Sequence, residues 1–347
     1  MEENQSIPMN SSVPDLRKLI VLNPDGTYTR LLHYPTVPAD SSSSLLPVLT
    51  KDIQINSTKK TWLRIYLPRH LLHSSSNRLP LIVYYHGGSF IFFAADSTFH
   101  HDFCIIMSQR IDAVIVSIEY RRAPEHRLPA AYDDAFEALE FIKSSQEDWL
   151  TQFTDLSRCF LMGTSAGGNI AYHTGLRVCR SGRELEPLKI QGLVLHHPFF
   201  GGLERTGSEL RLVNDSSLPL DGNDFMWELS LPVGYDRDHE YCNPMTASSS
   251  SSKFIREAGL RVLVLGAYGD PLIDRLVEFA KMLEENGVMM VAHFGEGSHG
   301  VELFDSLKAE LLFSILKDFF TKMQLNKDNF GSDAINKKRE TYHLIKK

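Results

Sequence analysis

A serine between two glycines is the feature of this sequence best suited to chemistry. Ser165 lies in the segment GTSAG at residues 163–167, after a short apolar run and before a segment with helical spacing. A tight strand-to-helix turn presents a serine as a nucleophile, and the glycines leave room where a Cβ would clash. The first N–H groups of the helix would face a developing oxyanion. We therefore predict that Ser165 performs acyl transfer; the alternative is a glycine-rich turn with a helix-capping serine.

A second glycine-rich segment, HGGSF at residues 86–90, also follows an apolar run. Acyl transfer builds negative charge on a carbonyl oxygen, and the backbone N–H groups of such a loop can approach that oxygen closely. The two segments together are more specific than either one alone. We expect His86 to fix this loop through hydrogen bonds rather than to transfer protons.

A serine nucleophile needs a base and an acid that orients the base, in the chain order serine, acid, histidine. His299 lies in a glycine-rich loop, GEGSHG at residues 295–300, and is the predicted base. His293, inside the preceding predicted strand, is the second candidate. His196 and His197 end an earlier strand and could line a pocket, but they precede any plausible acid.

Two aspartates follow the apolar run at residues 262–265 and compete for the role of the acid. Asp270 leaves the predicted strand just before Pro271 opens a helix, so its carboxylate suits the orienting role. Asp274 lies one helical turn later, where an acid is favoured by the helix dipole. We predict that Asp270 is the acid and that Asp274 stabilises the start of the helix.

Short apolar runs alternate with helical patterns along the chain and must position these residues. Such alternation predicts a parallel sheet with helices on both faces. We expect strands at residues 61–67, 81–85, 113–119, 159–162, 193–196, 262–265 and 288–294, and helices at 103–111, 130–144, 166–177, 272–286 and 307–323.

Three segments fall outside this alternation. Residues 1–50 are rich in Pro and Ser, with a predicted hairpin turn at residues 23–26. An insertion at about residues 201–258, with a helix at 220–229, suggests a lid over one edge of the sheet. Residues 324–347 form a polar tail that we expect to be poorly ordered. Residues 51–323 form the predicted main domain.

The composition excludes several functional classes. The 347 residues carry a net charge of −7, which gives no reason to seek nucleic acid or anionic lipid as a partner. The 4 cysteines contain no CxxC pair, which argues against a zinc finger or a disulfide framework. Neither a signal peptide nor a membrane-spanning run is visible. We therefore expect a cytoplasmic location, with the nucleus as the other compartment considered; the oligomeric state is unknown.

Taken together, these segments resemble the plant carboxylesterases of the hormone-sensitive-lipase-like group of the α/β-hydrolases. The resemblance runs from about Asn23 to about Met323. Beyond the candidate nucleophile, acid and base, it includes the motifs at residues 120–134, 197–202, 227–232 and 236–240.

The resemblance implies an α/β-hydrolase fold, with a mostly parallel central sheet flanked by helices and a cap made by the N-terminal segment and the insertion. It implies a serine carboxylesterase that needs no metal or cofactor and acts on a small-molecule ester or plant metabolite. The catalytic residues would be Ser165, Asp270 and His299; the oxyanion hole would be formed by Gly87, Gly88, Ser89 and Ala166. Four aromatic residues are candidates for an apolar substrate pocket, although such residues more often belong to a core: Phe90, Phe199, Phe200 and Trp227.

One departure from the family leaves alternatives open. The third glycine of the HGGG motif is replaced by Ser89, which is strained if that position has a positive φ. The family also contains a gibberellin receptor that has lost the triad histidine, and His299 argues against that role here. A cyclase, dehydratase or eliminase of plant specialised metabolism, or a hormone-like binding protein with residual esterase activity, remains an alternative to hydrolysis.

Overall fold

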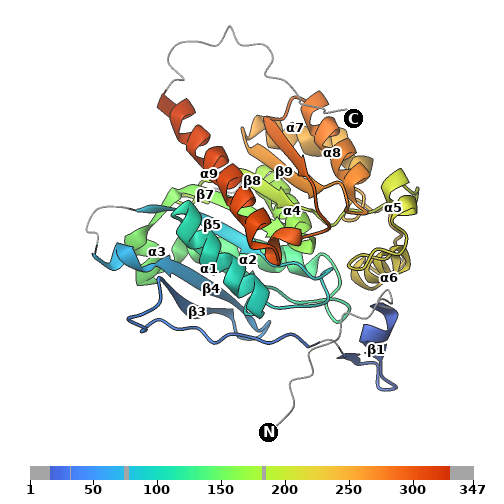
Figure 1. Cartoon of the computed structure of the whole chain (residues 1–347), viewed down its shortest axis with the longest axis horizontal. Coiled ribbons are helices and arrows are strands. Elements are labelled where there is room, and N and C mark those ends of the chain that lie inside the picture. Colours follow the sequence, from blue (N-terminus) through green and yellow to red (C-terminus); the bar gives the residue numbers. More distant parts are fainter. Residues whose placement is uncertain (1–15, 32, 74–77, 182–184, 329–347) are drawn as a thin grey trace.

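A single eight-stranded sheet forms the centre of the molecule (Figure 1). The computed structural model describes residues 16–31, 33–73, 78–181 and 185–328. The strands of the sheet follow the order β10-β9-β8-β7-β5-β6-β4-β3. Their bounds are β3 Val48–Asn56, β4 Thr61–Pro68, β5 Leu79–Tyr85, β6 Val114–Glu119, β7 Thr154–Thr164, β8 Ile190–His196, β9 Arg261–Ala267 and β10 Met290–Gly295.

Six of these strands, from β10 to β6 in the sheet order, are mutually parallel, whereas β4 and β3 are antiparallel to their neighbours. The prediction of a mostly parallel sheet is therefore confirmed. Strand β3 was not predicted, because Thr50, Lys51 and Asp52 interrupt its apolar residues and because it follows a Ser- and Pro-rich segment. It begins at Val48, so the first strand of the sheet starts within the segment assigned to residues 1–50.

Helices cover both faces of the sheet. In β5, Ile82 and Tyr84 join the core beneath α1 (Thr98–Ile111) and α9 (Ser306–Asp328), whereas Leu81 and Val83 join the larger core on the other face. That larger core includes residues of α2 Ala130–Ser144, α3 Asp148–Phe153, α4 Ala166–Ser181 and α8 Ile273–Glu285. Both faces of the parallel strands are buried, which explains their continuous apolar runs.

The insertion and the N-terminal segment meet beside the sheet (Figure 1). The insertion contains α5 Gly207–Arg211, α6 Leu220–Ser230 and α7 Ser248–Glu257. The predicted N-terminal hairpin is present as β1 Ile20–Leu22 paired with β2 Tyr28–Arg30. The 3-10 turn η1 (Leu16–Leu19) that precedes β1 contacts α6. The two segments expected to form a cap thus touch each other.

At its C-terminal end, α9 runs to Asp328, past the predicted helix end at residue 323, and the rest of the predicted tail lies outside the described residues. None of the helices in the described ranges combines the length and the apolar character that a membrane crossing requires.

Candidate active site

Ser165 occupies a sharp turn between β7 and α4. Its φ is 56°, a left-handed value that is uncommon for a residue with a side chain. The turn is fixed on both sides, because the Ser165 N–H donates to His196 O at 2.9 Å and the Phe199 N–H donates to Ser165 O at 2.9 Å. The strained turn is held in place by the neighbouring strand β8 and the residues that follow it.

The two glycines of the turn are required by close backbone contacts. A Cβ on Gly163 would lie 2.1 Å from the oxygen of Gly167, and a Cβ on Gly167 would lie 1.9 Å from the oxygen of Tyr85. Real Cβ contacts are not this short. The sequence argument for these glycines therefore has a direct steric basis: α4 crosses the end of β5 too closely for any side chain.

Asp270 and His299 are brought together at the carboxyl edge of the sheet. Asp270 follows β9 and is fully buried, and its Oδ2 accepts a hydrogen bond from His299 Nδ1 at 2.7 Å. Its Oδ1 accepts from the Leu272 N–H at 2.9 Å. The Nε2 atom of His299 has no hydrogen-bond partner among the described residues. A histidine oriented in this way carries a free basic nitrogen, as a general base needs.

The HGGSF loop lies directly against the nucleophile. A Cβ on Gly87 would lie 3.4 Å from Ser165 Cβ, so the two backbones are neighbours. The Gly87 N–H donates to His100 Nε2 at 3.3 Å and is not free for an oxyanion. In the described part of the chain, the N–H groups of Gly88, Ser89 and Ala166 donate to no protein acceptor. These three donors can serve an oxyanion, whereas Gly87 differs from the expectation because its proton is already engaged.

Ser89 adopts a φ of 53°, and Phe90 next to it a φ of 65°. The positive φ answers the question raised by the sequence: Ser89 carries backbone strain that glycine would avoid. The Ser89 carbonyl accepts from Ser230 Oγ at 3.3 Å, and Ser230 ends α6 of the insertion. The insertion therefore contacts the loop that lies beside the nucleophile.

His86 holds this loop from behind. Its ring stacks on Tyr120 at a centroid distance of 4.2 Å, and its Nε2 lies 3.5 Å from the buried Glu119 carboxylate. The Tyr120 hydroxyl donates to His86 O at 2.9 Å. Burial favours the neutral form of Glu119, but contact with His86 outweighs it and lowers the pKa of that carboxyl.

The four aromatic pocket candidates are all buried and divide into two groups. Phe199 stacks on Trp227 at 4.8 Å, and Phe90 approaches both rings. Phe200 instead packs against Phe279 of α8, at 4.9 Å, on the far side of this segment. Phe90, Phe199 and Trp227 thus form one cluster between the HGGSF loop and α6, whereas Phe200 belongs to the core under α8.

The runner-up residues lie elsewhere. His293 is exposed on the edge strand β10. His173, inside α4, stacks on Tyr132 at 4.8 Å. The Asp274 carboxylate accepts from the Ser208 N–H at 2.7 Å, so it supports the start of α5 as well as lying in the first turn of its own helix.

Sequence reasoning set aside one residue that the structure brings into the site. His197, just beyond the end of β8, donates from Nδ1 to Asp270 Oδ2 at 2.7 Å, the same oxygen that binds His299. Its Nε2 lies 3.3 Å from Glu302 Oε2, and His196 Nε2 lies 3.1 Å from the same oxygen. In the sequence, only the positions of His197 and Glu302 could have indicated this contact. His197 follows β8 and Glu302 lies three residues after His299, so both fall at the carboxyl edge of the sheet.

The charged forms of His197, Asp270 and Glu302 stabilise one another. Burial opposes a charge on His197, but its contacts with Asp270 and Glu302 raise its pKa to about 9. Burial also opposes a charge on Asp270 and Glu302, yet the adjacent histidines hold the pKa of each carboxyl below its ordinary range. These contacts therefore favour the protonated form of His197 at neutral pH, with Glu302 at ion-pair distance from an Nε2 that makes no hydrogen bond among the described residues.

Two sets of these side chains have the spacing of metal ligands: His196 with His197 and Glu302, and His197 with Asp270 and His299. Both sets contain His197. An imidazole that is protonated on both nitrogens has no lone pair to offer a metal. The hydrogen bonds and charges of the site thus account for these groupings as proton-sharing contacts.

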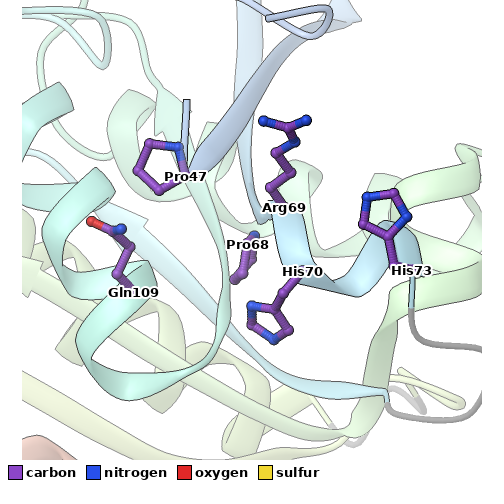
Figure 2. Close-up of a pocket in the computed structure, with 6 residues that line it drawn as sticks. All are labelled: Pro47, Pro68, Arg69, His70, His73 and Gln109. Atoms are coloured by element: carbon purple, nitrogen blue, oxygen red, sulfur yellow. The ribbon is translucent and has the colours of Figure 1, made fainter. Parts of the chain in front are cut away.

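One open pocket lies away from this site, where β4 ends. Its lining includes Pro68, Arg69, His70 and His73 (Figure 2). The cavity has a volume of about 450 Å³. Because β4 is antiparallel to β6, its end lies at the amino edge of the parallel strands, opposite the edge that carries Ser165 and Asp270. This pocket is not part of the candidate active site.

Comparison with known proteins agrees with the geometry. The model of the α/β-hydrolase fold family matches residues 82–302. Carboxylesterase 20 of Arabidopsis thaliana is 49% identical over 308 residues, covering 86% of this chain and 94% of the relative. The chain belongs to the plant carboxylesterases. A 3-O-acetylpapaveroxine carboxylesterase of Papaver somniferum is 48% identical over 307 residues, covering 85% of this chain and 95% of the relative.

This membership confirms the resemblance identified from the sequence, and with it the class of carboxylic ester hydrolase. A gibberellin receptor of Arabidopsis thaliana is also similar, with 34% identity over 78% of this chain and 77% of the receptor. Among solved structures, a hyperthermophilic esterase from the archaeon Pyrobaculum calidifontis has a TM-score of 0.67 and 27% identity, covering 79% of this chain and 86% of that one.

Proposed function

We propose that this carboxylesterase hydrolyses small carboxylic esters through an acyl-enzyme on Ser165. The observation that carries the proposal is the 2.7 Å bond between His299 Nδ1 and Asp270, with His299 Nε2 left without a partner. Ser165 lies on a left-handed turn between a strand and a helix, which is the backbone arrangement of a nucleophile elbow.

In the proposed reaction, His299 Nε2 removes the proton from Ser165 as its oxygen attacks the ester carbonyl. Asp270 keeps the His299 proton on Nδ1 and stabilises the imidazolium that forms. The N–H groups of Gly88, Ser89 and Ala166 bind the oxyanion. His299 then protonates the leaving alcohol, and a water molecule, deprotonated by the same nitrogen, releases the acid.

The proposed substrates are esters of small plant specialised metabolites. The similarity to a 3-O-acetylpapaveroxine carboxylesterase supports this class, because that relative is named for an acetylated compound. The buried cluster of Phe90, Phe199 and Trp227 packs beside the HGGSF loop and makes the surroundings of that loop apolar. The four free cysteines support a reducing compartment, so we propose the cytosol.

Turnover of p-nitrophenyl acetate by wild type and Ser165→Ala tests the proposal. We expect a loss in kcat of about 10³-fold or more, because the acyl-enzyme cannot form. His299→Ala should show a similar loss, whereas His293→Ala, which alters an exposed residue on β10, should retain wild-type activity. Wild-type rates for Ser165→Ala would refute the mechanism.

Ser89 supports a second candidate, a cyclase, dehydratase or eliminase that uses the same oxyanion loop. A residue with a side chain at φ 53° costs backbone energy that the HGGG form avoids, so it needs a function to retain it. Ser89→Gly separates the candidates. A gain in esterase rate of about tenfold or more would favour the second candidate, and an unchanged rate would favour hydrolysis. Labelling of wild type by a fluorophosphonate would confirm an activated Ser165 in either case.

A further inference from the structure

The candidate acid, Asp270, accepts hydrogen bonds from two imidazoles rather than one. Asp270 Oδ2 accepts from His299 Nδ1 and from His197 Nδ1, each at 2.7 Å. The two rings lie 5.3 Å apart and nearly perpendicular, at 79°. His197 is fully buried and touches no solvent, so this second bond is part of the interior of the site.

Among the described residues, the ionisable groups that contact His197 come from the carboxyl edge of the sheet. Asp270 follows β9, Glu302 lies in the 3-10 turn η4 (Val301–Leu303), and His299 precedes that turn. The fourth neighbour is His196, at a ring distance of 4.8 Å. Burial lowers the pKa of His196, so it is neutral and adds no charge. His197 therefore lies between two carboxylates and beside one base.

The Glu302 carboxylate also ends a chain of hydrogen bonds that begins at the oxyanion loop. Gly87 N–H donates to His100 Nε2, which leaves the proton of that ring on Nδ1. Each remaining group then donates to the next one. His100 Nδ1 donates to the Tyr84 hydroxyl (3.2 Å), and Tyr84 donates to the Thr164 hydroxyl (3.0 Å). Thr164 donates to His196 Nδ1 (2.9 Å), and His196 Nε2 donates to Glu302 (3.1 Å). Burial keeps His100 neutral, as this order requires, because it holds its pKa well below the ordinary value.

From this arrangement we infer that His197 is a positioning residue. Its imidazolium, held between Asp270 and Glu302, fixes the carboxylate that orients His299 and reduces the negative charge that His299 experiences. The inference rests on the proposed triad and adds to it a positive charge that takes no part in proton transfer.

The expected consequence concerns the pH dependence of the reaction. A cation about 5 Å away in a buried site disfavours a second positive charge on the triad by an amount equivalent to about one pH unit or more. Loss of the His197 charge should therefore move the acid limb of the pH–rate profile to higher pH.

His197→Asn removes the charge and keeps the geometry. The amide nitrogen of asparagine can replace Nδ1 as the donor to Asp270, and asparagine tolerates the φ of 46° at this position. We expect the acid limb of the kcat/KM profile for p-nitrophenyl acetate to move to higher pH by about one unit. An unchanged acid limb in this folded variant would overturn the inference.

Glu302→Gln provides a test of opposite sign. It removes a negative charge and keeps an oxygen that can accept from His196, while Asp270 keeps His197 protonated at acid pH. The acid limb should move to lower pH. If the acid limb moved in the same direction in His197→Asn and Glu302→Gln, the inference would be contradicted. General damage to the site would move it the same way in both variants, whereas a charge effect moves it in opposite ways. His196→Gln, which replaces a neutral donor to Glu302, should leave the acid limb at the wild-type pH.

Imidazole ¹⁵N NMR of the wild-type enzyme provides a test that does not depend on a folded variant. Both nitrogens of His197 should carry protons at pH 7, and a neutral His197 at that pH would overturn the inference. Failure of the triad itself is distinguishable, because Ser165→Ala would then retain activity whatever the state of His197.

Discussion

Asp270 shows, at the scale of a single residue, how a buried charge is held. Its two oxygens accept from His299, His197 and the Leu272 N–H, so three donors surround one carboxylate. Removing one donor leaves two, whereas removing the carboxylate leaves His197 with Glu302 as its only counter-ion. The base and the acid should therefore differ in their importance for stability.

His299→Ala and Asp270→Ala test this difference. Both should reduce kcat by about 10³-fold or more, because each removes a member of the triad. His299→Ala should lower the free energy of unfolding by only about 1 kcal/mol, whereas Asp270→Ala should cost about 3 kcal/mol or more, as expected when one partner of a buried ion pair is removed. Urea denaturation monitored by circular dichroism measures both values. Equal costs would contradict the proposed charge arrangement.

At the scale of secondary structure, the turn between β7 and α4 depends on close contact between backbones. Gly163→Ala would place a Cβ 2.1 Å from the oxygen of Gly167, and neither backbone can move without displacing β5 or α4. We expect a loss of about 3 kcal/mol or more in the free energy of unfolding, with little activity in the soluble fraction.

Gly295→Ala is the matched control, because it lies at the end of β10 with a negative φ and nothing within 4 Å of the added Cβ. Its free energy of unfolding should equal that of wild type to within about 0.5 kcal/mol. If both glycine variants were equally stable, the steric account of the turn would be wrong.

The elements around Ser165 could be predicted because each has a local signal. Glycine spacing, a short apolar run and a helical pattern define a strand, turn and helix without reference to the rest of the chain. Strand β3 has a weaker signal: three consecutive polar residues, Thr50 to Asp52, interrupt its apolar pattern, and its pairing with β4 depends on residues beyond its own segment. The engagement of the Gly87 N–H by His100 was equally invisible, because the two residues meet only when α1 packs on the sheet.

His197 illustrates the same limit within the site. The order of residues along the chain argued against it, because it precedes Asp270 in the sequence. Its role depends on β8 lying next to β9 in the sheet, which places His197 beside Asp270 through the parallel register of the two strands. Sequence order identifies the members of the triad, but contacts across strands decide which other groups share them.

For the whole molecule, the charged group at the carboxyl edge makes stability depend on pH. Burial disfavours the His197 cation, but Asp270 and Glu302 raise its pKa to about 9 from an ordinary value of 6.5. Its stabilising contribution is therefore complete below pH 6.5 and is lost as the pH rises through about 9. The carboxyls behave in the opposite sense: the pKa values of Asp270 and Glu302 are lowered, so their contributions are lost in acid.

The difference in unfolding free energy between wild type and His197→Asn isolates the first of these effects, since other buried groups that titrate in base are common to both proteins. The stability advantage of wild type should decrease by a value on the order of 3 kcal/mol between pH 6.5 and pH 9.5. Denaturation curves at several pH values measure it. A difference that does not change with pH would show that His197 is neutral in the folded protein.

The shared oxygen of Asp270 also has a consequence for how this fold can evolve. If His299 is lost, the buried carboxylate keeps a charged partner in His197 and a donor in Leu272, so the interior remains compensated. A single substitution can then end hydrolysis without making the chain unstable, and the lineage that carries it retains the fold and the oxyanion loop. Selection can then act on what the folded chain binds rather than on what it cleaves. In this scaffold, the loss of an enzyme is thus a short step towards a receptor.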